Sequence, residues 1–167
     1  YRRRTDIVRF VNGIPLLFVE LKRNDVDVQD AYTDNYTDYL DTISHLFYYN
    51  AFLMLSNGTE AKVGTLGSKY EFFHEWKRLA EEDEGSVALE TMLLGICKKE
   101  NFLDLLENFI LFDHSNGHTA KILARNHQYI GVNEAIKAYA DRKLNDGKLG
   151  VFWHTQGSGK SYSMVFL

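Results

Sequence analysis

Apolar and polar positions alternate in blocks that predict a sheet in the first part of the chain. Four runs of β-branched and apolar residues are bounded by turn-forming residues, which is typical of strands. These runs are 5–11, 14–21, 51–55 and 61–66. The first two flank Asn12-Gly13, a strong hairpin turn signal. The second is apolar on nearly every position, which indicates burial on both faces, and we expect the last two to pair with each other.

Helical spacing of apolar residues appears in the segments between and after these strands. We expect helices at 27–40, 71–81, 86–97, 101–112 and 128–144. Ser86 is a candidate N-cap, and Ser115-Asn116-Gly117 is the best candidate for a linker. A short apolar run follows at 121–124, and a terminal strand is expected at 150–155. The mixture of elements predicts an α/β protein.

Composition and charge limit the binding partners and the cellular environment that we expect for this chain. The chain has 167 residues and a formal net charge of -4, so bulk attraction to nucleic acid is not expected. A local basic strip at Tyr1-Arg2-Arg3-Arg4 could contact phosphate, and the alternative is a solvated chain start. Cys97 lies in an apolar segment and is expected to be buried and reduced, which fits a cytoplasmic protein. No apolar run approaches the about 20 residues that span a bilayer.

The C-terminal segment carries a phosphate-binding loop. Thr155-Gln156-Gly157-Ser158-Gly159-Lys160-Ser161 follows an apolar run and opens a helix. Gly157 and Gly159 let backbone N–H groups point at a triphosphate, while Lys160 supplies a cation and Ser161 a magnesium-binding hydroxyl. A nucleotide-hydrolysing domain needs further strands and an acidic residue after such a loop. We therefore expect the start of an ATP-driven motor, in a piece of a larger protein that does not hydrolyse ATP alone.

The first hairpin carries a second constellation. Glu20 and Lys22 project from one face of their strand because side chains alternate, and Asp6 precedes the other strand. Two acids and a lysine beside a buried strand are costly unless they are paired. Around a magnesium ion, Asp6 and Glu20 would be ligands, and Lys22 would orient water or offset charge on a phosphate. The alternative is an edge-strand ion pair with Asp6 capping a turn.

The interpretation of these residues as a magnesium site that cleaves a phosphodiester makes a geometric demand. A regular two-residue loop at Asn12-Gly13 would place Asp6 opposite Val19, on the wrong side of the sheet. A three-residue loop or a β-bulge would bring Asp6 beside Glu20 instead. The sequence therefore predicts one of these irregularities.

Taken together, the motifs resemble a known family. They are Asp6-Ile7-Val8, Val11-Asn12-Gly13-Ile14-Pro15-Leu16, Phe18-Val19-Glu20-Leu21-Lys22, Leu46-Phe47-Tyr48-Tyr49-Asn50, Ser56-Asn57-Gly58 and 151–161. The hairpin resembles the nuclease motif of the PD-(D/E)xK superfamily. The whole set is similar to the restriction (motor) subunit of type I restriction-modification enzymes.

This resemblance implies a domain organisation and partners. Residues 1–113 would be an N-terminally truncated endonuclease domain with a restriction-endonuclease-like mixed sheet flanked by helices. Residues 114–167 would be the first strand and P-loop of a RecA-like, superfamily 2 helicase-like translocase domain, truncated at its C-terminus. The implied cofactors are Mg²⁺ and ATP. The implied partners are double-stranded DNA and the methyltransferase and specificity subunits, in the cytoplasm and without a membrane.

Catalytic roles follow from the resemblance residue by residue. Asp6, Glu20 and Lys22 match the nuclease acid, acid and lysine, and the backbone carbonyl of Leu21 is the implied further metal ligand. The family has a Gln and a Tyr four residues apart on the next helix. Here these positions are Asn35 and Tyr39, so the tyrosine matches and the glutamine is replaced by a shorter amide.

Gln128, in Arg125-Asn126-His127-Gln128, resembles the adenine-reading glutamine of superfamily 2 helicases. It would bind ATP together with Thr155, Gln156, Gly157, Ser158, Gly159, Lys160 and Ser161. The alternative is a surface glutamine at a helix start. The loop departs from the general pattern at His154, where a glycine often stands.

Other signals are weaker, and other functions stay open. His114 and His118 flank a turn without a third metal ligand nearby, and Trp76 is more often a core residue than a base-stacking one. One alternative function is a nucleic-acid-dependent ATPase with a degenerate, non-cleaving nuclease fold. Another treats residues 1–113 as a docking platform for other subunits.

Overall fold

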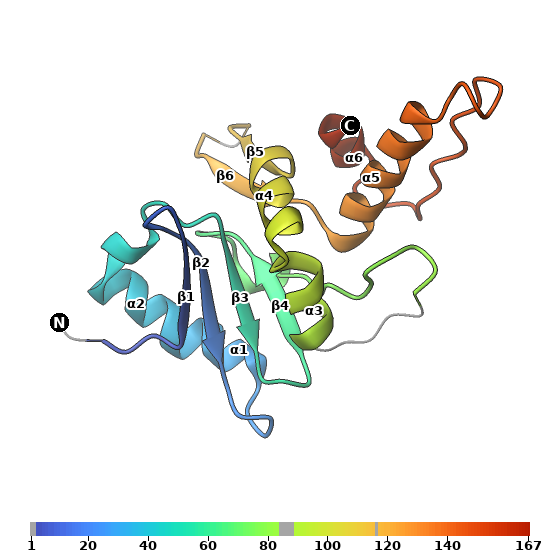
Figure 1. The fold of residues 1–167 in the computed structure, drawn as a ribbon. Coiled ribbons are helices and arrows are strands. Elements are labelled where there is room, and N and C mark those ends of the chain that lie inside the picture. The colour runs from blue at the N-terminus through green and yellow to red at the C-terminus, as the bar shows by residue number, and fades with distance from the viewer. Residues whose placement is uncertain (1–2, 84–88, 116) are drawn as a thin grey trace.

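A four-stranded mixed sheet forms the centre of the computed structural model, which describes residues 3–83, 89–115 and 117–167 (Figure 1). The strand order is β1-β2-β3-β4, with only the β2–β3 pair parallel. The strands are β1 (Ile7–Val11), β2 (Ile14–Leu21), β3 (Phe52–Ser56) and β4 (Ala61–Gly64). All four predicted strands and the predicted α/β class are confirmed.

One long helical segment covers one face of this sheet. It consists of α1 (Val28–Asp30), the π-helix η1 (Ala31–Tyr36) and α2 (Thr37–Thr42), and a 3-10 turn η2 (Ser44–Phe47) follows. Val28 and Tyr36 pack against Phe18 of β2 and Leu53 of β3 in one buried cluster. Because side chains alternate along β2, Glu20 lies on the same face as Phe18 and therefore beneath this helical segment.

Helices from later in the chain cover the opposite face. They are α3 (Leu89–Ile96) and α4 (Lys99–Asn108). Ile96 and Phe102 pack against Leu17 and Phe52 in the larger buried cluster. The chain continues into the hairpin β5 (Ile110–Asp113) and β6 (Ala120–Leu123), then α5 (Asn126–Ala140) and α6 (Lys160–Phe166) (Figure 1).

The predicted helix at 71–81 is wrong. A single 3-10 turn, η3 (Tyr70–Phe72), is followed by extended backbone, in which His74 pairs with Val63 of β4. The buried side chains are Phe73 and Trp76, whereas Phe72 is exposed. An extra bridge to the sheet edge satisfies the backbone here, so tertiary pairing outweighs the helical spacing.

The ends of the other predicted helices also need correction. The helix expected to reach 112 ends at Asn108, because Ile110–Asp113 pairs with β6 instead. Ser115 and Gly117 therefore belong to a hairpin connection, whereas Asn116 and Ser86 lie outside the described residues. The hairpin joins both sides of the proposed boundary at 113 and 114, and the division into two domains stays a proposal.

The terminal strand expected at 150–155 is absent from the described part of the chain. Val151 is 90% exposed and Trp153 83% exposed, although both belong to an apolar run. A buried strand of this kind needs neighbouring strands to satisfy its backbone, and no described residues pair with it. The helix predicted after the loop is confirmed as α6. Cys97 is a free, half-buried thiol rather than a fully buried one.

Candidate functional site

The first hairpin contains the irregularity that the site demands. Phe10 pairs with Pro15, whereas Arg9 pairs with Leu17, so Leu16 is an extra residue in β2. This is a β-bulge, in which two residues of one strand face one residue of the other. The predicted irregularity is confirmed as a bulge, while the turn itself keeps its two residues.

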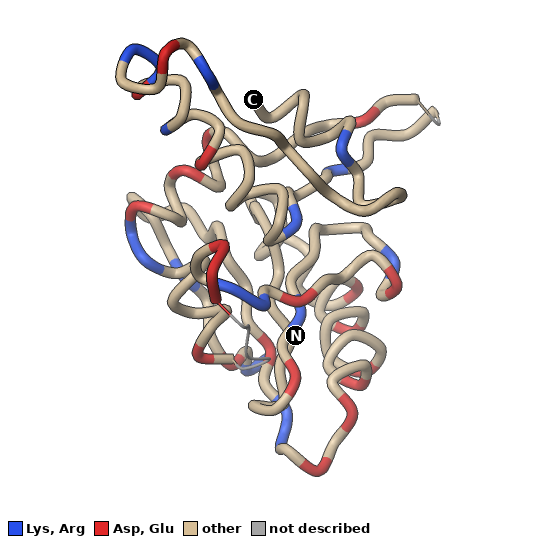
Figure 2. Tube along the Cα trace, turned by 90° about the vertical axis from the view of Figure 1, so that its right-hand side faces the viewer, with Lys and Arg blue, Asp and Glu red and all other residues tan. Residues whose placement is uncertain are grey.

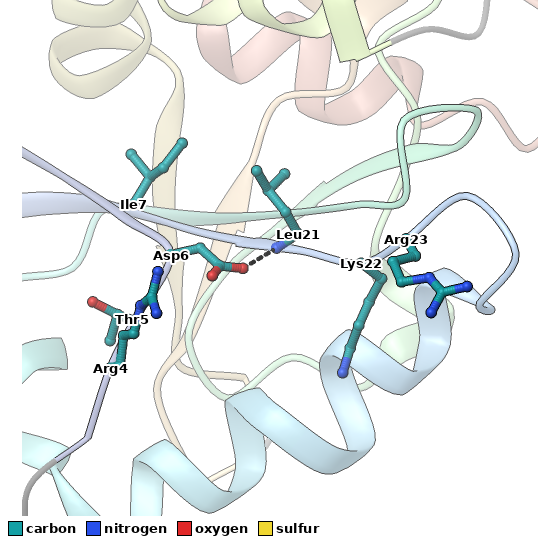
Figure 3. Close-up of a pocket in the computed structure, with 7 residues that line it drawn as sticks. All are labelled: Arg4, Thr5, Asp6, Ile7, Leu21, Lys22 and Arg23. Atoms are coloured by element: carbon teal, nitrogen blue, oxygen red, sulfur yellow. Dashed lines mark hydrogen bonds between the residues drawn. The ribbon is translucent and has the colours of Figure 1, made fainter.

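The bulge brings the two carboxylates to the same position of the sheet. Beyond it, Ile7 pairs with Val19, so the next step of the register places Asp6 beside Glu20. The Asp6 carboxylate accepts a hydrogen bond of 2.8 Å from the backbone N–H of Leu21 (Figure 3). This bond ties the segment before β1 to the end of β2 and fixes the Asp6 side chain at the end of the hairpin.

Glu20 is held in an environment that disfavours its charge. Glu20 is only 3% exposed. Its Oε2 atom is buried and has no hydrogen-bond partner among the described residues. Burial, and then the charge of Asp6, raise the pKa of Glu20 to about 7, although Lys22 acts in the opposite direction. A buried carboxylate oxygen without a partner is a position that a cation would satisfy.

The helical segment above β2 supplies the other two predicted catalytic residues. The Lys22 ammonium donates a hydrogen bond to Oδ1 of Asn35, which lies in the π-helix. The Tyr39 hydroxyl donates to the backbone carbonyl of Arg4 at 2.9 Å, and its ring packs edge-on against Phe18. Asn35 thus contacts the lysine, and Tyr39 contacts the segment that carries Asp6. Single π-helical turns within α-helices are frequent at functional sites.

An open pocket of about 430 Å³ lies over Asp6 and Lys22. Its lining residues come from the two ends of the hairpin (Figure 3): Arg4, Thr5, Asp6, Ile7, Leu21, Lys22 and Arg23. Thr5 and Arg23 were not among the candidates from the sequence, and the only signal for Arg23 is its position next to Lys22. Glu20 is not part of this lining, because it is buried in the sheet beneath the helical segment.

The donor set fits magnesium better than a softer metal. No group of three or more His, Cys, Asp and Glu side chains able to hold a metal occurs among the described residues. Magnesium needs only one or two carboxylates, since it keeps water and substrate phosphate as its remaining ligands. Asp6 and the unpartnered oxygen of Glu20 meet that requirement. The backbone carbonyl of Leu21 as a further ligand stays a prediction.

The glycine-rich loop at the C-terminal end has the backbone expected of it. Gly157 and Gly159 have φ angles of 79° and 81°, a conformation that favours glycine. The Lys160 ammonium donates hydrogen bonds to the carbonyls of His154, at 2.8 Å, and Thr155, at 3.1 Å. The lysine is therefore bound to its own loop. Gln156 and Ser161 are exposed beside it.

Gln128 lies against this loop. It is 3% exposed, so it is not a surface glutamine. Its Nε2 donates to the carbonyl of Gly159 at 2.9 Å, and its Oε1 accepts from the backbone N–H of Arg125 at 2.8 Å. The neighbouring His127 ring also bonds to the Ser158 carbonyl at 2.9 Å. The structure thus brings the predicted glutamine and the predicted loop together, with the amide occupied by protein groups.

The remaining candidates behave as structural residues. Trp76 is 2% exposed and packs on Tyr129, so it belongs to the core as expected. His114 is exposed and bonds to Thr119 in the hairpin connection. None of the helices in the described ranges is long and apolar enough to cross a bilayer.

Comparison with known proteins agrees with these motifs. Residues 1–72 match the family described as "Type I restriction enzyme R protein N terminus", and residues 127–167 match the SWI2/SNF2 ATPase family. The first match covers the bulged hairpin and the helical segment above it, and the second covers Gln128 and the loop. Both matches fall on the parts of the chain that carry candidate chemistry.

Individual relatives match along almost the whole chain. The type I restriction enzyme HindI endonuclease subunit of Haemophilus influenzae is 39% identical over 99% of this chain and 17% of its own length. The putative MjaIXP endonuclease subunit of Methanocaldococcus jannaschii is 31% identical over 98% of this chain and 18% of its own length. The SauCOLORF180P endonuclease subunit of Staphylococcus aureus is 25% identical, over 96% and 17%.

These matches confirm the resemblance that the motifs predict. The chain is homologous to the endonuclease subunits of type I restriction enzymes, and its C-terminal segment is similar to the start of an SWI2/SNF2 ATPase. The chain spans about a sixth of the length of these relatives.

Proposed function

We propose that this chain forms the nuclease site and the beginning of the motor of a type I restriction endonuclease subunit, and that the full-length protein cleaves double-stranded DNA with Mg²⁺. One observation carries the proposal. The bulge brings Asp6 beside Glu20, which has a buried, unpartnered carboxylate oxygen, and both Asp6 and Lys22 line the open pocket. An ordinary surface ion pair would leave no carboxylate oxygen buried without a partner.

The two acids and the lysine have separate roles. Asp6, Glu20 and the Leu21 carbonyl would hold Mg²⁺, which would supply Lewis-acid activation of water and phosphate. Because burial and the charge of Asp6 raise the pKa of Glu20 to about 7, this residue would have to release a proton to become a ligand. Lys22 places a positive charge at the pocket edge, where it offsets the charge that develops on the scissile phosphate.

Asn35 and Tyr39 keep this arrangement in place. The Asn35 side-chain oxygen accepts a hydrogen bond from the Lys22 ammonium and so fixes the direction of the lysine side chain. Tyr39 binds the backbone of Arg4 and thereby holds the segment that leads into Asp6. Asparagine is shorter than the glutamine of the family, but the π-helix shifts the backbone locally, and the amide still reaches Lys22.

The C-terminal segment begins the nucleotide site of the motor. Gln128 reads the adenine, and the loop from Thr155 to Ser161 binds the phosphates, with Ser161 as a ligand of Mg²⁺. For ATP to bind, Lys160 exchanges its two loop carbonyls for phosphate oxygens, and the Gln128 amide leaves Gly159. A phosphate oxygen carries more negative charge than a backbone carbonyl, so this exchange strengthens the contacts of the Lys160 ammonium.

This function implies a larger assembly. Residues 1–113 take the restriction-endonuclease-like fold, and residues 114–167 begin a RecA-like translocase completed by further sequence. The methyltransferase and specificity subunits supply the DNA sequence recognition, and the complex works in the cytoplasm. Translocation driven by ATP feeds duplex DNA to the nuclease site.

The test is magnesium-dependent cleavage of supercoiled plasmid DNA by the full-length protein with its partner subunits and ATP. Lys22→Ala is expected to lower the cleavage rate at least a hundredfold, the scale of one preorganised charge at a transition state. Lys69→Ala, which removes an 81% exposed lysine elsewhere, is the control. Equal cleavage by both variants would favour a degenerate nuclease fold or a docking platform.

A further inference from the structure

The pocket over Asp6 carries more positive charge than the proposed chemistry uses. Arg4, Lys22 and Arg23 line it, and Asp6 is the one acidic residue in the lining. Figure 3 shows Arg4 and Arg23 at opposite ends of the pocket, with Asp6 between them. A chain with net charge -4 does not attract a polyanion as a whole, so a local excess of cations marks a preferred contact.

The guanidinium of Arg4, unlike that of Arg3, is available to bind a phosphate. Arg3 is engaged with Asp38 at 2.9 Å and with Thr42 at 3.2 Å. The guanidinium of Arg4 pairs with no carboxylate among the described residues, and its side chain is exposed. Its backbone is nevertheless fixed, because its carbonyl accepts the Tyr39 hydroxyl. A fixed backbone with an unpaired guanidinium suits the binding of a phosphate.

Arg23 is held by a partner that it can exchange. Asp25 accepts two hydrogen bonds from its guanidinium, at 3.0 and 2.6 Å. The Arg23 side chain is 81% exposed and the Asp25 side chain 57% exposed, so water screens the pair strongly. A phosphate offers the same two-oxygen geometry as this carboxylate. Binding of DNA can therefore replace Asp25 at little cost.

The neighbouring helix restricts where DNA can lie. Six aspartates without intervening Lys or Arg lie on the helical segment and on the turn that leads into it (Figure 2): Asp25, Asp27, Asp30, Asp34, Asp38 and Asp41. Arg3 and Arg23 offset the charges of Asp38 and Asp25, and the other four aspartates repel a phosphate backbone. The favourable path for a DNA strand therefore runs along the pocket, from Arg4 past Asp6 to Arg23.

We propose that Arg4 and Arg23 bind the DNA phosphates on either side of the scissile phosphodiester, and that Asp25 occupies Arg23 until DNA arrives. This inference rests on the proposed nuclease function. It assigns to the two arginines the placement of the strand, so that the scissile phosphate meets Asp6, Glu20 and Lys22.

The test uses the full-length protein with its partner subunits and plasmid DNA, and measures KM, kcat and their dependence on KCl. Arg4→Ala and Arg23→Ala are each expected to raise KM about tenfold with little change in kcat. Each should also flatten the plot of log KM against log salt by about 0.9, the value for one lost phosphate contact on duplex DNA. Arg4→Lys and Arg23→Lys should keep most of that slope, which a merely structural role does not predict.

A second pair of variants tests the part played by Asp25. Asp25→Asn frees Arg23 and should lower KM severalfold, whereas Asp41→Asn, which changes net charge equally on the same acidic surface, should not. If the arginine variants have the KM and salt slope of the Lys69→Ala control, the inference is overturned. If instead Lys22→Ala cleaves DNA normally, the proposed nuclease function fails whatever the arginines do.

Discussion

Glu20→Gln tests the unusual protonation of the buried carboxylate. The pKa of Glu20 is raised from 4.5 to about 7, so the folded chain keeps a proton that the unfolded chain releases in this interval. Stability from this proton is present below pH 4.5 and is lost as pH rises to about 7. Glutamine is neutral at every pH, so the variant should lack this dependence.

The magnitude follows from the size of the pKa difference. Each tenfold change in proton affinity corresponds to about 1.4 kcal/mol, so a rise from 4.5 to about 7 corresponds to about 3 kcal/mol. Water at the open pocket screens part of this, and we expect about 2 kcal/mol. Without divalent metal, the unfolding free energy of the wild type relative to Glu20→Gln should therefore fall by about 2 kcal/mol between pH 4.5 and pH 8.

Urea unfolding at a series of pH values, followed by the fluorescence of the buried Trp76, measures this difference. Glu90→Gln, at an exposed position, is the control. Addition of Mg²⁺ should stabilise the wild type more at pH 8 than at pH 5, because the metal competes with the proton. A wild type and Glu20→Gln that keep a constant difference in stability from pH 4.5 to 8 would refute the reasoning.

Three further substitutions probe other contacts. Gly159→Ala places a Cβ 2.6 Å from Nε2 of Gln128 at a φ of 81°, and should weaken nucleotide binding by the full-length protein about tenfold in a filter-binding assay. Gly95→Ala places a Cβ 2.2 Å from Nε1 of Trp76, and should lower the unfolding free energy by about 1–3 kcal/mol in urea. Tyr39→Phe removes a hydrogen bond to the backbone, and should lower it by about 1 kcal/mol and slow plasmid cleavage. Unchanged binding, stability or cleavage, respectively, would contradict each assignment.

The sequence predicts the first hairpin well because two local rules constrain it. Asn12-Gly13 marks the turn, and strand alternation then requires either a three-residue loop or a bulge if Asp6 and Glu20 are to share a face. The position of the bulge at Leu16 is not predictable in this way, because any of several residues of β2 before Val19 could be the extra one. The π-helix that carries Asn35 leaves no local signature in the sequence either.

Features that depend on contacts between distant parts of the chain could not be predicted from the sequence. Residues 71–81 have helical spacing, but the backbone of His74 pairs with Val63 of β4, and the spacing within 71–81 cannot reveal this pairing. The unpartnered oxygen of Glu20 arises only when the helical segment closes over β2. Arg23 becomes a candidate binding residue only because it lines the pocket that both ends of the hairpin form.

The most direct test of the account is divalent cation binding by the full-length protein without nucleotide, measured by the electron paramagnetic resonance of free Mn²⁺. The wild type should hold an ion that both Asp6→Asn and Glu20→Gln lose, while Lys69→Ala retains it. The affinity should fall about tenfold for each pH unit below about 7, as the proton on Glu20 competes. Mn²⁺ binding that is the same in the wild type and both carboxylate variants would contradict the proposed metal site.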